Sequence, residues 1–146
     1  MPEITPFLWF DAPLEEPIAY YRSIFPDMRV QSQSSGSAEF EIEGQRFMAL
    51  NGGPKYSFNE AISFFIECED QEEVDYYWDR LTADGGEESM CGWLKDRYGL
   101  SWQVIPKALI RYLGDPDREK AGRARDAMLE MGRIDVAALD RAAEAS

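Results

Sequence analysis

The chain has 146 residues, a length typical of a single domain that can bury a hydrophobic core. Its formal net charge of -13 disfavours nucleic acid and anionic membranes as partners, because like charges repel. Histidine is absent, which excludes Ser-His-Asp and Cys-His catalysis and removes the commonest metal ligand.

The first part of the chain predicts a strand, a helix and three further strands. An apolar, aromatic run at residues 4–11 is typical of a buried strand. Apolar residues then recur at helical spacing over 14–25, with Glu15 and Glu16 in the first turn, where the helix dipole favours acids. The next three strands are expected at 28–33, 38–42 and 46–51.

After a loop at residues 51–60, the same order of elements returns. A strand is predicted at 61–67 and a helix at 70–81, with Asp70 as its N-cap and Glu73 as the capping-box partner. Three more strands are expected at 88–90, 93–96 and 100–106. The chain therefore predicts two tandem β-α-β-β-β modules.

The last predicted strand carries a polar residue in an apolar context. Alternation places Ser101, Gln103 and Ile105 on one face of this strand and Trp102 and Val104 on the other. We expect Trp102 to face the helix layer, and Gln103 is a candidate ligand residue. The turn that precedes the strand carries Lys95, Asp96 and Arg97 side by side, a mixture of charges that predicts a solvated turn.

Past Pro106 the pattern becomes helical. Helices are expected at 107–113, 117–131 and 135–145, with Asp117 and Asp135 as N-caps. Their apolar residues would pack on the sheet or on a partner subunit. We interpret residues 1–146 as one domain, with modules at about 1–55 and 56–106 and a helical tail at 107–146.

Cellular location is indicated by the cysteines and the N-terminus. Cys68 and Cys91 form no CxxC pair and are too few for a disulfide framework, which predicts free thiols. No signal-peptide pattern or apolar run of about 20 residues is present. These features predict a cytoplasmic protein without a membrane segment.

Several long motifs resemble a known family. The motifs are FLWFDAPLEEPIAYYRSIFP, FMALNGGP, FNEAISFFIECEDQEEVDYYWDRL and CGWLKDRYGLSWQVIP, in this order from Phe7 to Pro106, together with MLEMGRIDVAALDRA near the C-terminus. They resemble the PhnB-like family, which carries the name 3-demethylubiquinone-9 3-methyltransferase. This family lies in the glyoxalase/bleomycin-resistance/dioxygenase group, also called the vicinal oxygen chelate superfamily. The resemblance implies an α+β, glyoxalase-like fold whose two modules form a cupped mixed sheet, and a homodimer.

The resemblance also implies where a metal would bind in related enzymes. Their ligands come from the first, fourth, fifth and eighth strands, which correspond to Pro6, to Phe47 or Ala49, to Ser63 and to Gln103. None of these is a histidine or carboxylate, so we expect no metal site and no cofactor.

The cup is expected to bind a small molecule through apolar and neutral polar groups. The candidate ligand residues are Leu8, Phe10, Asn51, Ser63 and Gln103. Each polar candidate also has a structural interpretation: Gln103 bonded to backbone, Ser63 bonded within its strand, and Asn51 as a turn former.

Three functions remain open from the sequence. The first is a metal-independent small-molecule-binding protein. The second is an enzyme, either a methyltransferase-like transferase, as the family name implies, or another lyase or transferase that uses Cys91, Lys95 or a group of the bound substrate. The third is an antibiotic-sequestering protein, for which an acidic cup would favour a cationic drug, although no acid is expected in the cup. Neither Gly52-Gly53 nor Gly85-Gly86 joins a strand to a helix, as the cofactor loop of a typical methyltransferase does.

Overall fold

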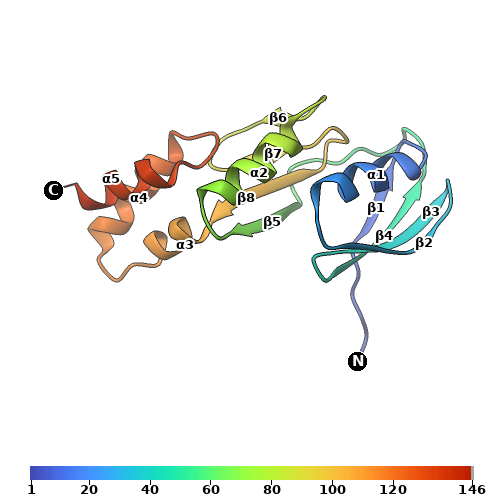
Figure 1. Ribbon diagram of the computed structural model, residues 1–146, viewed down its shortest axis with the longest axis horizontal. Coiled ribbons are helices and arrows are strands. Elements are labelled where there is room, and N and C mark those ends of the chain that lie inside the picture. The colour runs from blue at the N-terminus through green and yellow to red at the C-terminus, as the bar shows by residue number, and fades with distance from the viewer. Residues whose placement is uncertain (146) are drawn as a thin grey trace. The chain divides into compact units, whose positions relative to one another are not determined.

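A computed structural model describes residues 1–145 and confirms the tandem β-α-β-β-β repeat (Figure 1). The chain divides into two compact units, one at Met1–Phe58 and one that begins at Asn59. Each unit contains its own four-stranded sheet with parallel and antiparallel neighbours. Within residues 1–145, no helix is both long and apolar enough to cross a bilayer.

The first unit packs α1 against a sheet with the strand order β1-β4-β3-β2. Successive residues of a strand point to opposite faces of the sheet, so every second side chain faces α1. These side chains form a core with the helix. The rings of Phe10 in the sheet and Tyr21 in the helix lie 6.4 Å apart. The elements are β1 Phe7–Phe10, α1 Glu15–Ile24, β2 Met28–Gln33, β3 Ser37–Ile42 and β4 Gln45–Asn51.

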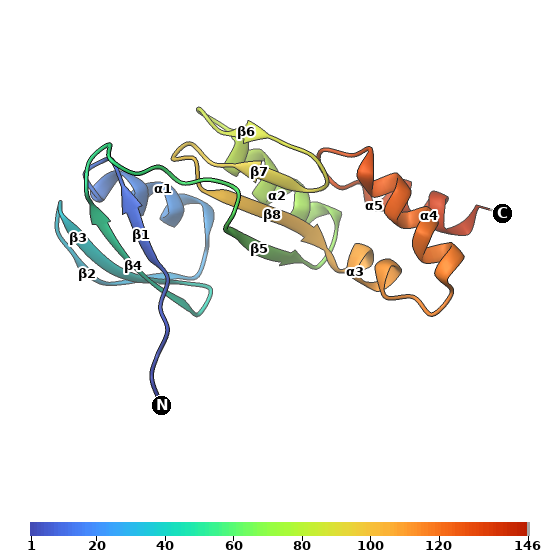
Figure 2. The ribbon, with the colours of Figure 1, turned by 180° about the vertical axis from the view of Figure 1, so that it is seen from behind.

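The second unit repeats this design with the strand order β5-β8-β7-β6. In Figure 2 its strands lie in front of α2, which covers the far face of the sheet. Asp70 caps α2, since its carboxylate accepts a hydrogen bond from the Glu73 amide at 3.0 Å, which confirms the predicted N-cap. The elements are β5 Ser63–Cys68, α2 Gln71–Thr82, β6 Glu87–Glu88, β7 Trp93–Lys95 and β8 Ser101–Pro106.

The C-terminal helices belong to the second unit and share an apolar cluster with the end of β8. Asp117 and Asp135 accept hydrogen bonds from the first turns of α4 and α5, which confirms both predicted N-caps. The helices are α3 Lys107–Leu113, α4 Arg118–Leu129 and α5 Val136–Glu144. The cluster contains Ile105, Leu109, Ala124, Ile134 and Leu139.

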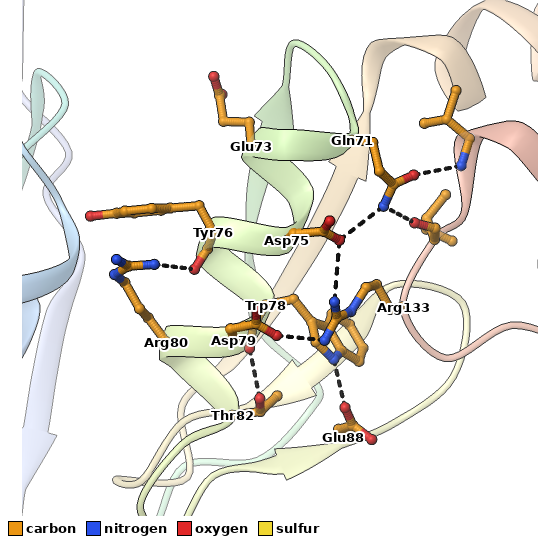
Figure 3. Close-up of polar contacts among 12 residues, drawn as sticks. Gln71, Glu73, Asp75, Tyr76, Trp78, Asp79, Arg80, Thr82, Glu88 and Arg133 are labelled. Atoms are coloured by element: carbon orange, nitrogen blue, oxygen red, sulfur yellow. Dashed lines mark hydrogen bonds and ion pairs between the residues drawn. The ribbon is translucent and has the colours of Figure 1, made fainter.

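Polar contacts join the segment before α5 to the solvent side of α2 (Figure 3). The Gln71 amide donates to the Ile134 carbonyl at 3.0 Å and accepts from the Val136 amide at 2.7 Å. Arg133 pairs with Asp75 and Asp79. The tail is therefore held against the second module by both apolar packing and hydrogen bonds.

Candidate ligand site

The second sheet has one face that α2 covers and one that it leaves open. Trp102 and Val104 of β8 are 4% and 0% exposed and lie on the covered face with Leu94 of β7, which pairs with Trp102. Alternation therefore turns Ser101 and Gln103 to the opposite side. We call this side the open face and define it by two rows of cross-strand neighbours: Ser63, Ser101 and Lys95, then Phe65, Gln103 and Trp93.

The structure brings together two of the residues selected from the sequence. The Gln103 side-chain amide donates a hydrogen bond of 3.0 Å to the Ser63 hydroxyl, and both residues are half-buried. They come from the neighbouring strands β8 and β5. Gln103 is thus bonded to a side chain, whereas the structural alternative from the sequence was a bond to backbone. The pair presents its remaining donors and acceptors on the open face.

A cavity of about 300 Å³ lies beside this pair, a volume at the lower end of the range for ligand pockets. Its lining includes Ser101 and Trp93 from the open face and acidic residues from the edge of the sheet. Ser101 is 1% exposed, and its hydroxyl has no hydrogen-bond partner among residues 1–145. Buried hydroxyls are normally paired, so the Ser101 hydroxyl marks the cavity as a candidate site.

Charged groups also line the cavity, contrary to the expectation that no acid lies at the ligand site. Lys95 forms an ion pair of 2.7 Å with Glu60, and Glu87 stands opposite Lys95 in the strand register. The hydrogen bond between Lys95 and Glu60 raises the pKa of the Lys95 ammonium and lowers the pKa of Glu60. Both groups therefore stay charged at neutral pH.

The turn before β8 differs from the solvated turn predicted from its charges. Asp96 is 2% exposed, and its carboxylate accepts bonds from the amides of Tyr98 and Leu100 and from the Trp102 indole. A buried carboxylate with three donors is satisfied by local geometry. Asp96 therefore fixes the turn and orients Trp102 toward the covered face.

The candidate ligand residues of the first unit, Leu8, Phe10 and Asn51, do not line this cavity. Leu8 and Phe10 are 7% and 2% exposed and belong to the core beneath α1, and their expected contribution to binding stays a prediction. The physical reason for their burial is the phase of β1, whose alternate residues Phe7 and Trp9 are the more exposed ones. Asn51 is exposed at the end of β4, and its contribution to binding stays a prediction.

The residues at the positions of the superfamily's metal ligands do not fit a metal. Ser63 and Gln103 are neutral and bonded to each other, while Phe47 and Ala49 are buried apolar residues. A divalent cation needs imidazole or carboxylate ligands at such positions. Within residues 1–145, no group of three or more His, Cys, Asp or Glu is arranged to hold a metal ion.

Comparison with protein families agrees with the sequence motifs. The family model named 3-demethylubiquinone-9 3-methyltransferase matches residues 2–105. The chain belongs to this family. The match ends at β8, so the helices that follow lie outside it. No sequence among curated proteins matches the chain.

Solved structures show the glyoxalase-like fold. A PhnB protein from Bacillus cereus that carries the same methyltransferase name is 29% identical, with a TM-score of 0.64 over 72% of this chain and 99% of that one. A glyoxalase-related enzyme from Fulvimarina pelagi is 14% identical (TM-score 0.55; 73% and 88% covered). The fosfomycin resistance protein from Listeria monocytogenes, solved with Mn(II) and sulfate, is 18% identical (TM-score 0.53; 70% and 87% covered).

None of the residues that line the cavity was among the ligand candidates selected from the sequence, and those missed include Ser101, Glu60 and Glu87. Ser101 shares the face of Gln103 by alternation, so the same pattern that selected Gln103 could have found it. Glu60 precedes β5 in an irregular segment, and Glu87 lies in a strand of two residues. Neither acid lies in a periodic pattern of apolar and polar residues, because such a pattern becomes visible only over several consecutive residues of a regular element.

Proposed function

We propose that the protein binds a small organic molecule on the open face, without a metal, through Gln103, Ser63 and Ser101. The Ser101 hydroxyl is the observation that supports this most directly. A buried hydroxyl without a partner costs about 1–3 kcal/mol, and a ligand atom that bonds to it removes that cost. The half-buried indole of Trp93 adds an apolar surface in the same cavity.

Binding is favoured over acid-base catalysis by the state of the charged groups that line the cavity. A general acid or base works best with a pKa near neutrality, whereas the Lys95 and Glu60 pKa values are shifted away from it. Burial raises the pKa of the Cys68 thiol to about 12, so this thiol is not a nucleophile at neutral pH.

The alternative function is methyl transfer, the activity in the family's name. Nucleotide-type cofactors commonly bind at a glycine-rich loop between a strand and a helix. Here residues 11–14 join β1 to α1 and residues 69–70 join β5 to α2, and neither connection contains glycine. These residues do not fit S-adenosylmethionine in that mode, and we derive no transfer step from them.

Native mass spectrometry of the purified protein tests the binding function. We expect an organic ligand to copurify with the wild type and to be lost in Gln103→Leu, because this change removes the amide from the open face. Gln33→Leu, on an exposed strand of the first unit, is the matched control and should retain the ligand. A stoichiometric divalent metal in the wild type would contradict the metal-independent function.

The same spectra report the number of subunits. We propose a homodimer, as the resemblance to the superfamily implies, and a cytoplasmic location, which is supported by the free thiols of Cys68 and Cys91. A monomer at all concentrations would contradict the dimer.

A further inference from the structure

The cavity on the open face combines an excess of acidic charge with an aromatic ring. Lys95 is paired with Glu60, while Glu87 lies across from Lys95 on the edge strand and adds a second carboxylate. One lysine therefore faces two acids. The carboxylate of Glu88 accepts a bond from the Trp78 indole of α2, so it is already used on the covered side.

We propose that the ligand of this cavity is an organic cation, whose ammonium group lies between Glu87 and the indole of Trp93. This inference rests on the proposed function and specifies its ligand class. A carboxylate offers an ammonium group a charge-assisted hydrogen bond, and an indole face attracts cations through its quadrupole. An anionic ligand in the same place would meet both carboxylates.

Ser101 provides the second, independent observation. Its strand, β8, lies between β5 and β7. The Lys95–Glu60 ion pair joins β7 to the segment before β5, and so it spans the strand that carries Ser101. Ser101 lines the same cavity as Glu87 and Trp93, so an ammonium group bound there can donate to the Ser101 hydroxyl, which has no partner among residues 1–145. A cationic ligand thus accounts both for the acidic charge of the cavity and for the unpaired hydroxyl of Ser101.

The net charge of the whole chain also favours a cationic ligand. A net charge of -13 attracts cations over distances up to the Debye length, about 10 Å at 0.1 M salt, and repels anions. A cationic ligand therefore gains in association rate as well as in contacts.

Three probes that share one ring and differ in charge test the inference: benzylamine, benzyl alcohol and benzoate. Binding is followed by NMR titration of backbone amides at neutral pH and low ionic strength. We expect benzylamine to bind most tightly and to shift the amides of Trp93, Ser101 and Gln103. Glu87→Gln keeps the size of the side chain and removes its charge, and it should weaken benzylamine about threefold to fivefold while leaving benzyl alcohol unchanged.

Glu130→Gln, an exposed change at the end of α4, is the matched control and should leave all three affinities unchanged. Tighter binding of benzoate or benzyl alcohol than of benzylamine would overturn the cation inference but not the binding function. An affinity for benzylamine that Glu87→Gln leaves unchanged would also overturn the cation inference but not the binding function. The remaining outcome is that no probe shifts the amides of the open face. In that case the cation inference fails alone if a ligand copurifies with the wild type, and both proposals fail if no ligand copurifies.

Discussion

Ser101 couples the candidate site to the stability of the free protein. Its hydroxyl is buried and has no partner among residues 1–145, so it destabilises the ligand-free fold. Ser101→Ala should therefore raise the free energy of unfolding by about 1 kcal/mol, as measured by urea denaturation. Ser32→Ala, at an exposed position of β2, should have almost no effect. A destabilised Ser101→Ala protein would show that the hydroxyl is bonded in the folded state.

At the scale of single residues, the sequence predicts a side chain's face better than its exposure. Alternation in β8 correctly separates Trp102 from Gln103, because a strand bounded by a turn and a proline has a defined phase. In β1 the aromatic residues Phe7, Trp9 and Phe10 occupy both faces, and hydrophobicity alone cannot show which face α1 covers. Leu8 and Phe10 were selected as apolar lining of the cup, and the structure shows that Phe10 packs against Tyr21 of α1.

Asp96 illustrates a further limit at this scale. In the sequence it lies between Lys95 and Arg97, a pattern typical of exposed residues. Its burial depends on the Trp102 indole and on two turn amides that approach it only in the folded chain. A tertiary hydrogen bond of this kind leaves no local pattern in the sequence.

The contact between α2 and the tail makes a prediction at the scale of elements. The Gln71 side chain satisfies the carbonyl of Ile134 and the amide of Val136, two backbone groups next to the start of α5. Gln71→Ala leaves both without this partner and should cost about 1–3 kcal/mol. We expect faster hydrogen exchange at the Val136 amide and in α5, together with a lower free energy of unfolding.

Glu72→Ala, at the adjacent exposed position of α2, is the control for helix propensity and should leave exchange in α5 unchanged. Unchanged exchange at Val136 in Gln71→Ala would show that the apolar cluster around Ile134 and Leu139 alone holds the tail.

The elements themselves could largely be predicted from the sequence. The helix at Lys107–Leu113 and the strand at Met28–Gln33 have the predicted bounds, because proline or glycine marks their ends. The strand predicted at 88–90 is instead Glu87–Glu88. Two consecutive glutamates do not indicate a strand, and pairing with β7 determines their conformation. The acidic edge of the candidate site was missed for the same reason.

The charge balance of the whole molecule determines how its stability responds to salt. The chain carries a net charge of -13, and its self-repulsion opposes the compact state. The ion pairs described for residues 1–145 involve side chains that are between 26% and 79% exposed. Exposed pairs contribute little, with a typical value of about 0–1 kcal/mol each, so the repulsion should dominate.

Sodium chloride should therefore raise the thermal midpoint of unfolding, because it screens the repulsion more than it weakens the ion pairs. Differential scanning calorimetry across a salt series measures this response. A variant with both Glu72→Gln and Glu130→Gln removes two exposed negative charges, and we expect it to have a higher midpoint at low salt and a shallower salt dependence. A midpoint that falls as salt is added would show instead that ion pairs, such as those of Arg133 with Asp75 and Asp79, outweigh the net charge.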